Sequence, residues 1–116
     1  MQVIRIYTGD DGETHFEDLE LPYEAIADAQ VTAMSGASGV QFRKTPSGSF
    51  SDWHQAPRRQ YVITLQGQSN ITIGDGTSHT FEIGDVLFAD DLTGRGHTTE
   101  VVSDEPRVSI FVPLTD

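Results

Sequence analysis

Short strand-like segments separated by glycine-containing turns fill most of this sequence, and they limit its fold more than any other feature. The segments are rich in Val, Ile, Tyr and Thr, the residues that favour strands. We expect strands over residues 3–7, 14–21, 40–45, 59–66, 70–74, 78–83, 86–89, 97–102 and 107–114. Asp75-Gly76, between two of these segments, is the clearest hairpin signal in the chain. Such closely spaced strands predict an all-β antiparallel sandwich, jelly roll or barrel.

One segment favours a helix instead. Pro22 suits a first helical turn, Glu24 suits the positive end of a helix, and alanines follow. We therefore expect one short helix over residues 22–29, within an N-terminal segment, residues 1–39, that packs on the barrel. The chain shows no repeat and no interior linker, so residues 1–116 are expected to form a single domain.

Composition excludes several classes of function. The chain has 18 acidic residues and seven basic ones, which gives a formal net charge of -11. A chain this acidic repels phosphate backbones, so we expect no nucleic-acid partner. It has no cysteine, which excludes disulfides and thiolate chemistry. Neither a signal peptide nor a membrane-length apolar run is visible, so we expect a cytoplasmic protein without a membrane partner.

The segment over residues 59–66 indicates which of its side chains face the interior. Successive strand residues point to opposite sides, so Gln60, Val62 and Thr64 would share one face. The residues between them, Tyr61, Ile63 and Leu65, are all apolar. Their face should therefore be covered, either by the N-terminal segment or by a second subunit. We expect a homodimer.

The spacing of several glycines and polar residues resembles the first motif of the cupin family. That motif has a glycine, five residues, His-x-His, three or four residues, a glutamate, six residues and a glycine. Gly48, His54, Gln60 and Gly67 fall on this spacing. Ala56 replaces the second histidine, and Gln60 replaces the glutamate.

A second cupin motif follows, in a modified form. Gly84 begins it, and the sequence from Gly94 to His97 reproduces its Gly-x-x-His. The gap is two residues longer than usual, Leu92 stands where a proline is expected, and Val101 replaces the asparagine. The resemblance covers about residues 40–113. It implies a small single-domain cupin of the RmlC-like type, an antiparallel double-stranded β-helix or jelly-roll barrel.

The resemblance also implies a polar pocket inside the barrel, which would bind a small polar molecule, a carboxylated one included. Its expected lining is His54, Ala56, Arg58, Gln60, Val62 and His97. Arg58 would lie at the mouth, where a guanidinium could bind a carboxylate. Alternatively, Arg58 is a rim residue that pairs with one of the many acids.

Cupins with the complete motif bind a divalent metal through three histidines and a glutamate. In this chain the corresponding ligands would be His54, His97 and the neutral amide of Gln60. An amide supplies only a dipole to a dication, where a carboxylate supplies a charge. The missing charge could come from Asp52, Asp90 or Asp91.

Two forms of an enzyme therefore remain open, besides a binding protein. With iron, manganese, nickel or zinc, the three ligands would polarise a substrate oxygen in an isomerase, lyase or dioxygenase. Without a metal, His54 or His97 would transfer protons while Gln60 orients the substrate. The third interpretation is a small-molecule binding or sensing module without catalysis.

Overall fold

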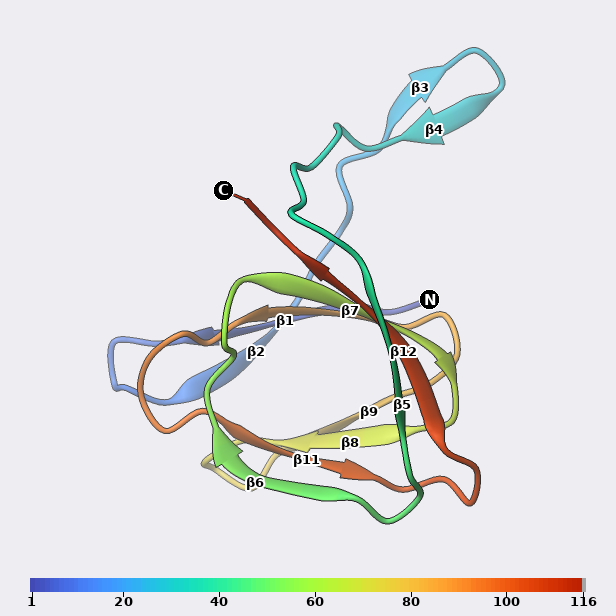
Figure 1. The fold of residues 1–116 in the computed structure, drawn as a ribbon. Coiled ribbons are helices and arrows are strands. Elements are labelled where there is room, and N and C mark those ends of the chain that lie inside the picture. Colours follow the sequence, from blue (N-terminus) through green and yellow to red (C-terminus); the bar gives the residue numbers. More distant parts are fainter. Residues whose placement is uncertain (116) are drawn as a thin grey trace.

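The computed structural model describes residues 1–115, which fold into two facing β-sheets and one separate hairpin (Figure 1). The larger sheet has the strand order β2-β1-β10-β7-β12-β5. Its strands are β1 Val3–Thr8, β2 Thr14–Asp18, β10 Val86–Asp90, β7 Gln60–Gln66, β12 Arg107–Pro113 and β5 Gln41–Thr45. The smaller sheet has the order β6-β11-β8-β9. Its strands are β6 Phe50–His54, β11 His97–Val101, β8 Ser69–Thr72 and β9 Ser78–Phe81.

The strands pair as a jelly roll requires, which confirms the all-β prediction. Neighbouring strands are antiparallel, except that β1 lies parallel to β10. Asp75-Gly76 does form the hairpin turn between β8 and β9, with Thr72 opposite Ser78 and a positive φ of 88° at Gly76. Residues 1–115 include no helix with the length and apolar character that a membrane crossing needs.

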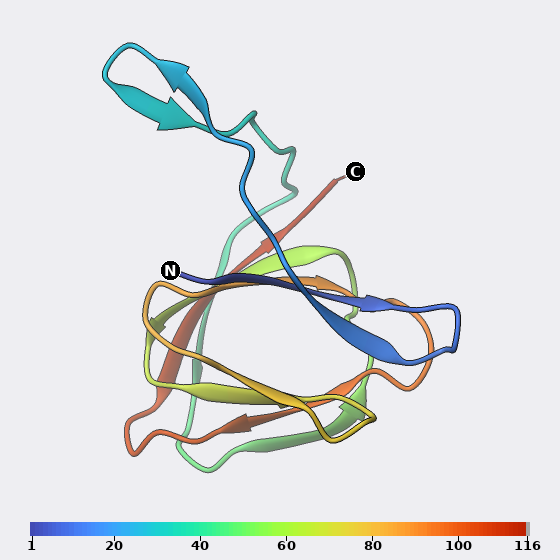
Figure 2. The same cartoon turned by 180° about the vertical axis from the view of Figure 1, so that it is seen from behind.

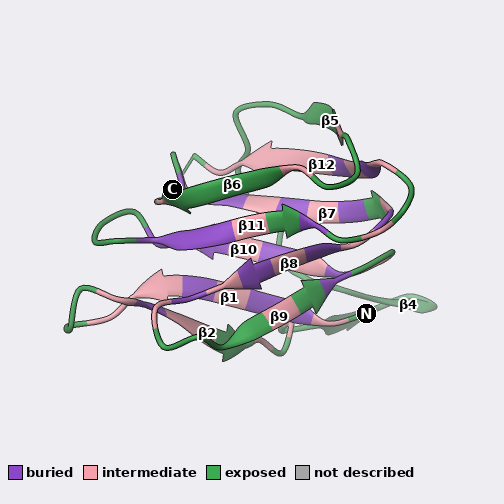
Figure 3. Ribbon diagram, turned by 90° about the horizontal axis from the view of Figure 1, so that it is seen from below, coloured by how far each residue is buried: buried purple, intermediate pink, exposed green. Residues whose placement is uncertain are grey.

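The space between the two sheets holds the hydrophobic core. In Figure 3 the buried segments lie on the central strands, while β5 and β6 at the sheet edges are exposed. Gln60, Val62 and Thr64 are all buried, as the alternation along β7 predicts. The apolar core cluster consists of Ile4, Ile6, Ala56, Val62, Ile71, Phe81, Leu87 and Ala89.

The expected helix over residues 22–29 is wrong. This part of the chain forms a β-hairpin, β3 Glu24–Ile26 and β4 Ala29–Val31, with Ala27 in the turn at a positive φ of 48°. The hairpin projects away from the barrel in both views, and every residue in its strands is exposed (Figures 1 and 2). A helix of about two turns is marginal without tertiary contacts, and here no core is within reach to stabilise one. The N-terminal segment therefore joins the barrel through β1 and β2 and, beyond the hairpin, through a bridge between Ala37 and Leu114 and a hydrogen bond from the Ser38 N–H to the Pro113 carbonyl.

A strand that the sequence did not predict is β6, which lies between the expected strands over residues 40–45 and 59–66. Its residues pair with β11, with His97 opposite His54 and Thr99 opposite Ser51. The strand is almost fully exposed, so the apolar pattern that indicates a buried strand is missing.

Candidate functional site

Two histidines from different strands meet at one end of the barrel. His54 is the last residue of β6 and His97 the first of β11, and the antiparallel register places them opposite each other. Their ring centroids are 4.4 Å apart. Gly96, immediately before His97, has a positive φ of 80°, and a Cβ there would collide with the backbone carbonyl of His54. The close contact of the two strands therefore requires glycine at this position.

A fully buried carboxylate holds His97 in place. Asp91 Oδ2 lies 2.6 Å from His97 Nδ1 and accepts a hydrogen bond from Thr14 Oγ1 at 2.9 Å. The backbone N–H of Ala56 approaches Asp91 Oδ1 at 3.3 Å. Asp91 has no exposed surface, and His97 is only 4% exposed. An ionised carboxylate can only accept, so beside ionised Asp91 the Nδ1 of His97 carries the proton, and in the neutral imidazole Nε2 is then the acceptor.

The other two acids considered in the sequence do not join this cluster. Asp90 accepts hydrogen bonds from Arg5 and Arg59 instead. The carboxylate of Asp52 accepts a hydrogen bond from the backbone N–H of Trp53. The backbone carbonyl oxygen of Asp52 lies 2.7 Å from Nδ1 of His54. Of these three acids, therefore, Asp91 is the one whose carboxylate contacts an imidazole of the site.

The side chain of Gln60 lines the same cavity as the histidines and has an unsatisfied acceptor. The residue is 3% exposed, and its Oε1 has no hydrogen-bond donor among the described residues. A buried acceptor without a partner is unfavourable by about 1–3 kcal/mol. This atom is therefore suited to accept a hydrogen bond from a ligand.

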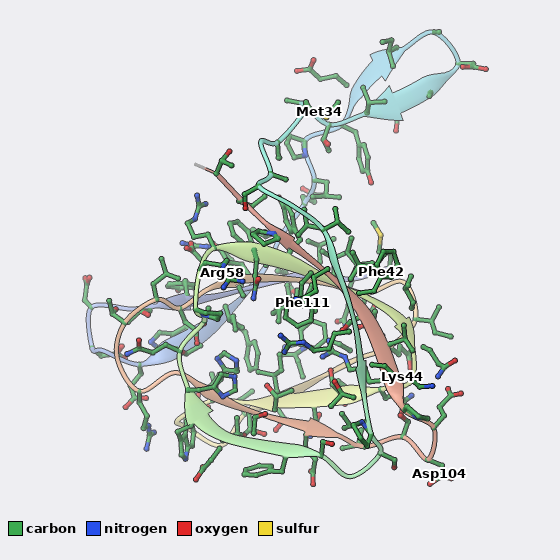
Figure 4. All side chains as sticks on the ribbon, in the orientation of Figure 1. Met34, Phe42, Lys44, Arg58, Asp104 and Phe111 are labelled. Atoms are coloured by element: carbon green, nitrogen blue, oxygen red, sulfur yellow. The ribbon has the colours of Figure 1, made fainter. Side chains whose placement is uncertain are left out.

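All six residues expected from the sequence line one cavity of about 520 Å³ inside the barrel. They are His54, Ala56, Arg58, Gln60, Val62 and His97. Figure 4 shows Arg58 at the rim, beside the connection from β6 to β7, and Phe111 between the two sheets. Arg58 is exposed and makes no ion pair within residues 1–115, so the expected pairing with an acid is absent there.

The same cavity has a basic part that the sequence did not predict. Arg43 of β5 and Arg107 of β12 both line it. Arg107 is only 6% exposed. Its burial, and then the positive charge of Arg43, lower the pKa of Arg107 to about 10. Strand alternation could have given one signal, because Arg107 shares its face of β12 with Phe111.

The donor set does not fit a divalent metal ion. The residues at the expected ligand positions supply two imidazoles and one neutral amide, while Asp91 is committed to His97, Thr14 and Ala56. Within residues 1–115, no group of three or more His, Asp or Glu side chains is arranged to hold a metal. A carboxylate ligand would offset part of the desolvation cost of a dication in a largely buried site, and this ligand set has none.

Comparison with solved structures identifies the fold. A conserved Streptococcus pyogenes protein of unknown function matches with a TM-score of 0.51 and 16% identity, covering 73% of this chain and 70% of that one. An RmlC-like cupin family protein with a double-stranded β-helix fold from Methanocaldococcus jannaschii matches with a TM-score of 0.54 and 17% identity. That match covers 83% of this chain and 91% of the other. No protein-family model and no curated protein matches the sequence.

The chain therefore has the double-stranded β-helix fold of the RmlC-like cupins, as its motif spacing predicted. Identities this low establish the fold alone, because one fold carries many functions. The activity has to be argued from the side chains of the cavity.

Proposed function

We propose that the barrel interior binds a small polar molecule, and that His97 exchanges a proton with it without a metal ion. The observation that supports this function most directly is the buried hydrogen bond of 2.6 Å between Asp91 and His97, of which His97 lines the cavity. A carboxylate that orients an imidazole is a common arrangement for general acid–base catalysis.

Each polar side chain has a separate task in this proposal. His97 Nε2 accepts a proton from the ligand, and Asp91 stabilises the imidazolium that forms. Gln60 Oε1 accepts a hydrogen bond from a hydroxyl or amino group of the ligand. His54, whose Nδ1 is engaged by the carbonyl of Asp52, offers its Nε2 to the same molecule. When the proton returns to the ligand, His97 is restored.

The first experiment measures binding and proton exchange separately. Small hydroxy acids, keto acids and sugars are screened by thermal shift, and each compound that stabilises the protein is incubated with it in D₂O. Proton NMR then follows the loss of C–H signals next to the ligand's carbonyl group. We expect His97→Gln to slow this exchange by a factor of about 10²–10⁴ while the ligand Kd changes little.

Binding without exchange would contradict the catalytic part of this function and leave a non-catalytic binding or sensing module. Elemental analysis of untagged protein, purified without chelator, tests the other part. Stoichiometric iron, manganese, nickel or zinc would support the metal-dependent alternative and contradict the metal-free mechanism. His54→Gln serves as a second variant, since it removes the neighbouring imidazole and leaves the Asp91–His97 pair intact.

We also propose that two copies of the chain associate through what we call the arm patch. This patch consists of exposed apolar residues on and beside the projecting hairpin, Ile26, Val31, Met34, Val40 and Phe42. Figure 4 shows Met34 at the base of the hairpin and Phe42 on the outer side of β5. Met34 is 97% exposed and Phe42 70%, so burial of this patch in a dimer would remove much apolar surface from water.

A further inference from the structure

Arg107 is a buried cation without a counterion among residues 1–115. The residue begins β12, lies in the cavity wall and is 6% exposed. Its Nε has no hydrogen-bond partner, and no carboxylate within residues 1–115 forms an ion pair with its guanidinium. The chain has 18 acidic residues, and buried charges are normally paired. An anion from outside the chain would satisfy this group.

A second guanidinium faces the same part of the cavity. In the register of β5 and β12, Arg107 lies opposite Thr45 and Arg43 opposite Ser109, so the two arginines are diagonal neighbours on one face. The guanidinium of Arg43 lies 4.2 Å from the ring centroid of Phe111. This stacking directs the second positive charge into the cavity, next to a group of the same charge.

We propose that Arg107 and Arg43 together bind the carboxylate of an organic acid whose body extends through the barrel toward His54 and His97. The inference rests on the proposed function, because it assigns the class of the molecule that occupies the same cavity. A guanidinium matches a carboxylate with two parallel hydrogen bonds. One of the two arginines can supply these hydrogen bonds, while the other adds a second positive charge.

The remaining cavity wall favours an organic acid over an inorganic anion. Beyond the arginines, the lining combines polar side chains, Asp52 among them, with the apolar residues Val62, Ile71, Leu87, Ala89, Val101 and Phe111. These apolar side chains can bury the carbon skeleton of a ligand, whereas a phosphate ion would leave them in contact with water.

The strand register places the arginines and the histidines at opposite ends of this cavity. Gln60 pairs with Ala89, two residues before the Asp91 that contacts His97, and also with Pro113, whereas Arg107 lies at the other end of β12. At about 3.3 Å per residue, the backbones at the two ends of this strand are about 20 Å apart. The long arginine side chains can reduce the distance between their guanidinium groups and the histidines. An acid anchored at Arg107 therefore directs its far end to His97, where the proton transfer is proposed.

The experiment compares acids with their uncharged amides. Hexanoate, benzoate and succinate are titrated into the protein at constant ionic strength, beside hexanamide, benzamide and succinamide. We expect at least one acid to raise Tm with increasing concentration and to bind in calorimetry, while its amide does neither. Equal binding of acid and amide, or no response to any of the acids, would overturn the proposal.

Variants then locate the binding site. Arg107→Met should weaken binding of the acid at least about tenfold, because it removes charge-assisted hydrogen bonds. Lys44→Met is the matched control, with the same change of charge on the opposite, exposed face of β5. It should change Kd less than about twofold, since exposed charges contribute little. Equal losses in the two variants would mean a general charge effect and would overturn the assignment.

Weaker binding in these variants can be distinguished from a loss of folding. Arg107→Met removes an unpaired buried charge, so without ligand its Tm should equal or exceed that of the parent chain. Arg43→Gln, at an exposed position, decides the matter if Arg107→Met does not fold, and should also weaken the acid at least about threefold.

Failure of this inference can be told apart from failure of the proposed function. If ligands bind and exchange protons through His97, and Arg107→Met and Arg43→Gln leave their Kd unchanged, the carboxylate site is wrong and the proposed function stands. If acids bind through Arg107 and no proton exchange depends on His97, the carboxylate site stands and the proposed catalysis is wrong.

Discussion

Gly96 determines how closely the two histidines can approach. Its backbone lies against the carbonyl of His54, and its φ of 80° is a conformation that residues with a side chain rarely adopt. Gly76 has a similar φ of 88°, but a Cβ there would meet no atom within 4 Å. A side chain would therefore strain the backbone at both positions, but it would collide with a neighbour only at Gly96.

We expect Gly96→Ala to lower the free energy of unfolding by about 3 kcal/mol or more, and Gly76→Ala by only about 1 kcal/mol. The difference arises because the new methyl group at position 96 would force β6 away from β11. Urea denaturation of both variants and the parent chain measures it. Equal losses would show that the contact between Gly96 and His54 does not constrain the site.

At the scale of elements, Asp85 joins the first strand to the rest of the larger sheet. Its carboxylate accepts hydrogen bonds from the backbone and side-chain N–H groups of Gln2, at 2.9 and 3.1 Å, and from the backbone N–H of Glu82 at 2.9 Å. Burial acts to raise the pKa of Asp85, but these hydrogen bonds outweigh it and the pKa is lowered. The parallel pairing of β1 with β10 begins at this carboxylate.

This direction of shift predicts a loss of stability in acid. A depressed pKa in the folded state means that the contribution of Asp85 is complete above the ordinary aspartate pKa of about 3.9. It is then lost as the pH falls toward the lower folded-state pKa. We expect Asp85→Asn to be less stable than the parent chain at pH 7 and to lose less stability below about pH 4.

Asp104→Asn is the control, because Asp104 is exposed and the change of charge is the same (labelled in Figure 4). Denaturant unfolding at several pH values compares the three proteins. Parallel pH profiles of the parent chain and Asp85→Asn would rule out this carboxylate as a source of the acid sensitivity.

At the scale of the whole molecule, the projecting hairpin is the largest departure from a closed barrel (Figure 2). The proposed dimer predicts that the arm patch is covered in solution. We expect the double variant Met34→Ser, Phe42→Ser to shift sedimentation equilibrium from dimer toward monomer, because two large exposed side chains lose their apolar surface.

Ile83→Ser is the matched control, since Ile83 is 69% exposed but lies on the turn between β9 and β10. This variant should sediment like the parent chain. A parent chain that is monomeric at all concentrations, or equal effects of the two sets of substitutions, would contradict the role of the arm patch.

The sequence alone was sufficient for the fold and for one end of the cavity. Turn glycines and strand alternation are local signals, and they predicted an all-β barrel with Gln60, Val62 and Thr64 facing inward. The motif spacing predicted that His54 and His97 lie together, and their ring centroids are 4.4 Å apart. The hairpin over residues 24–31 was not predicted, because the choice between a short helix and a hairpin depends on contacts outside the segment.

Tertiary structure decided which charges meet in the cavity. Asp52, Asp90 and Asp91 are all near the motif in sequence, so the sequence did not show which of them contacts a histidine. The folded barrel places the carboxylate of Asp91 against His97. Arg107 and Arg43 are far apart along the chain and become neighbours through the pairing of β5 with β12. Pairing between distant strands is not encoded in any local pattern, so the sequence determined the barrel and its histidines, and the folded chain determined the charges around them.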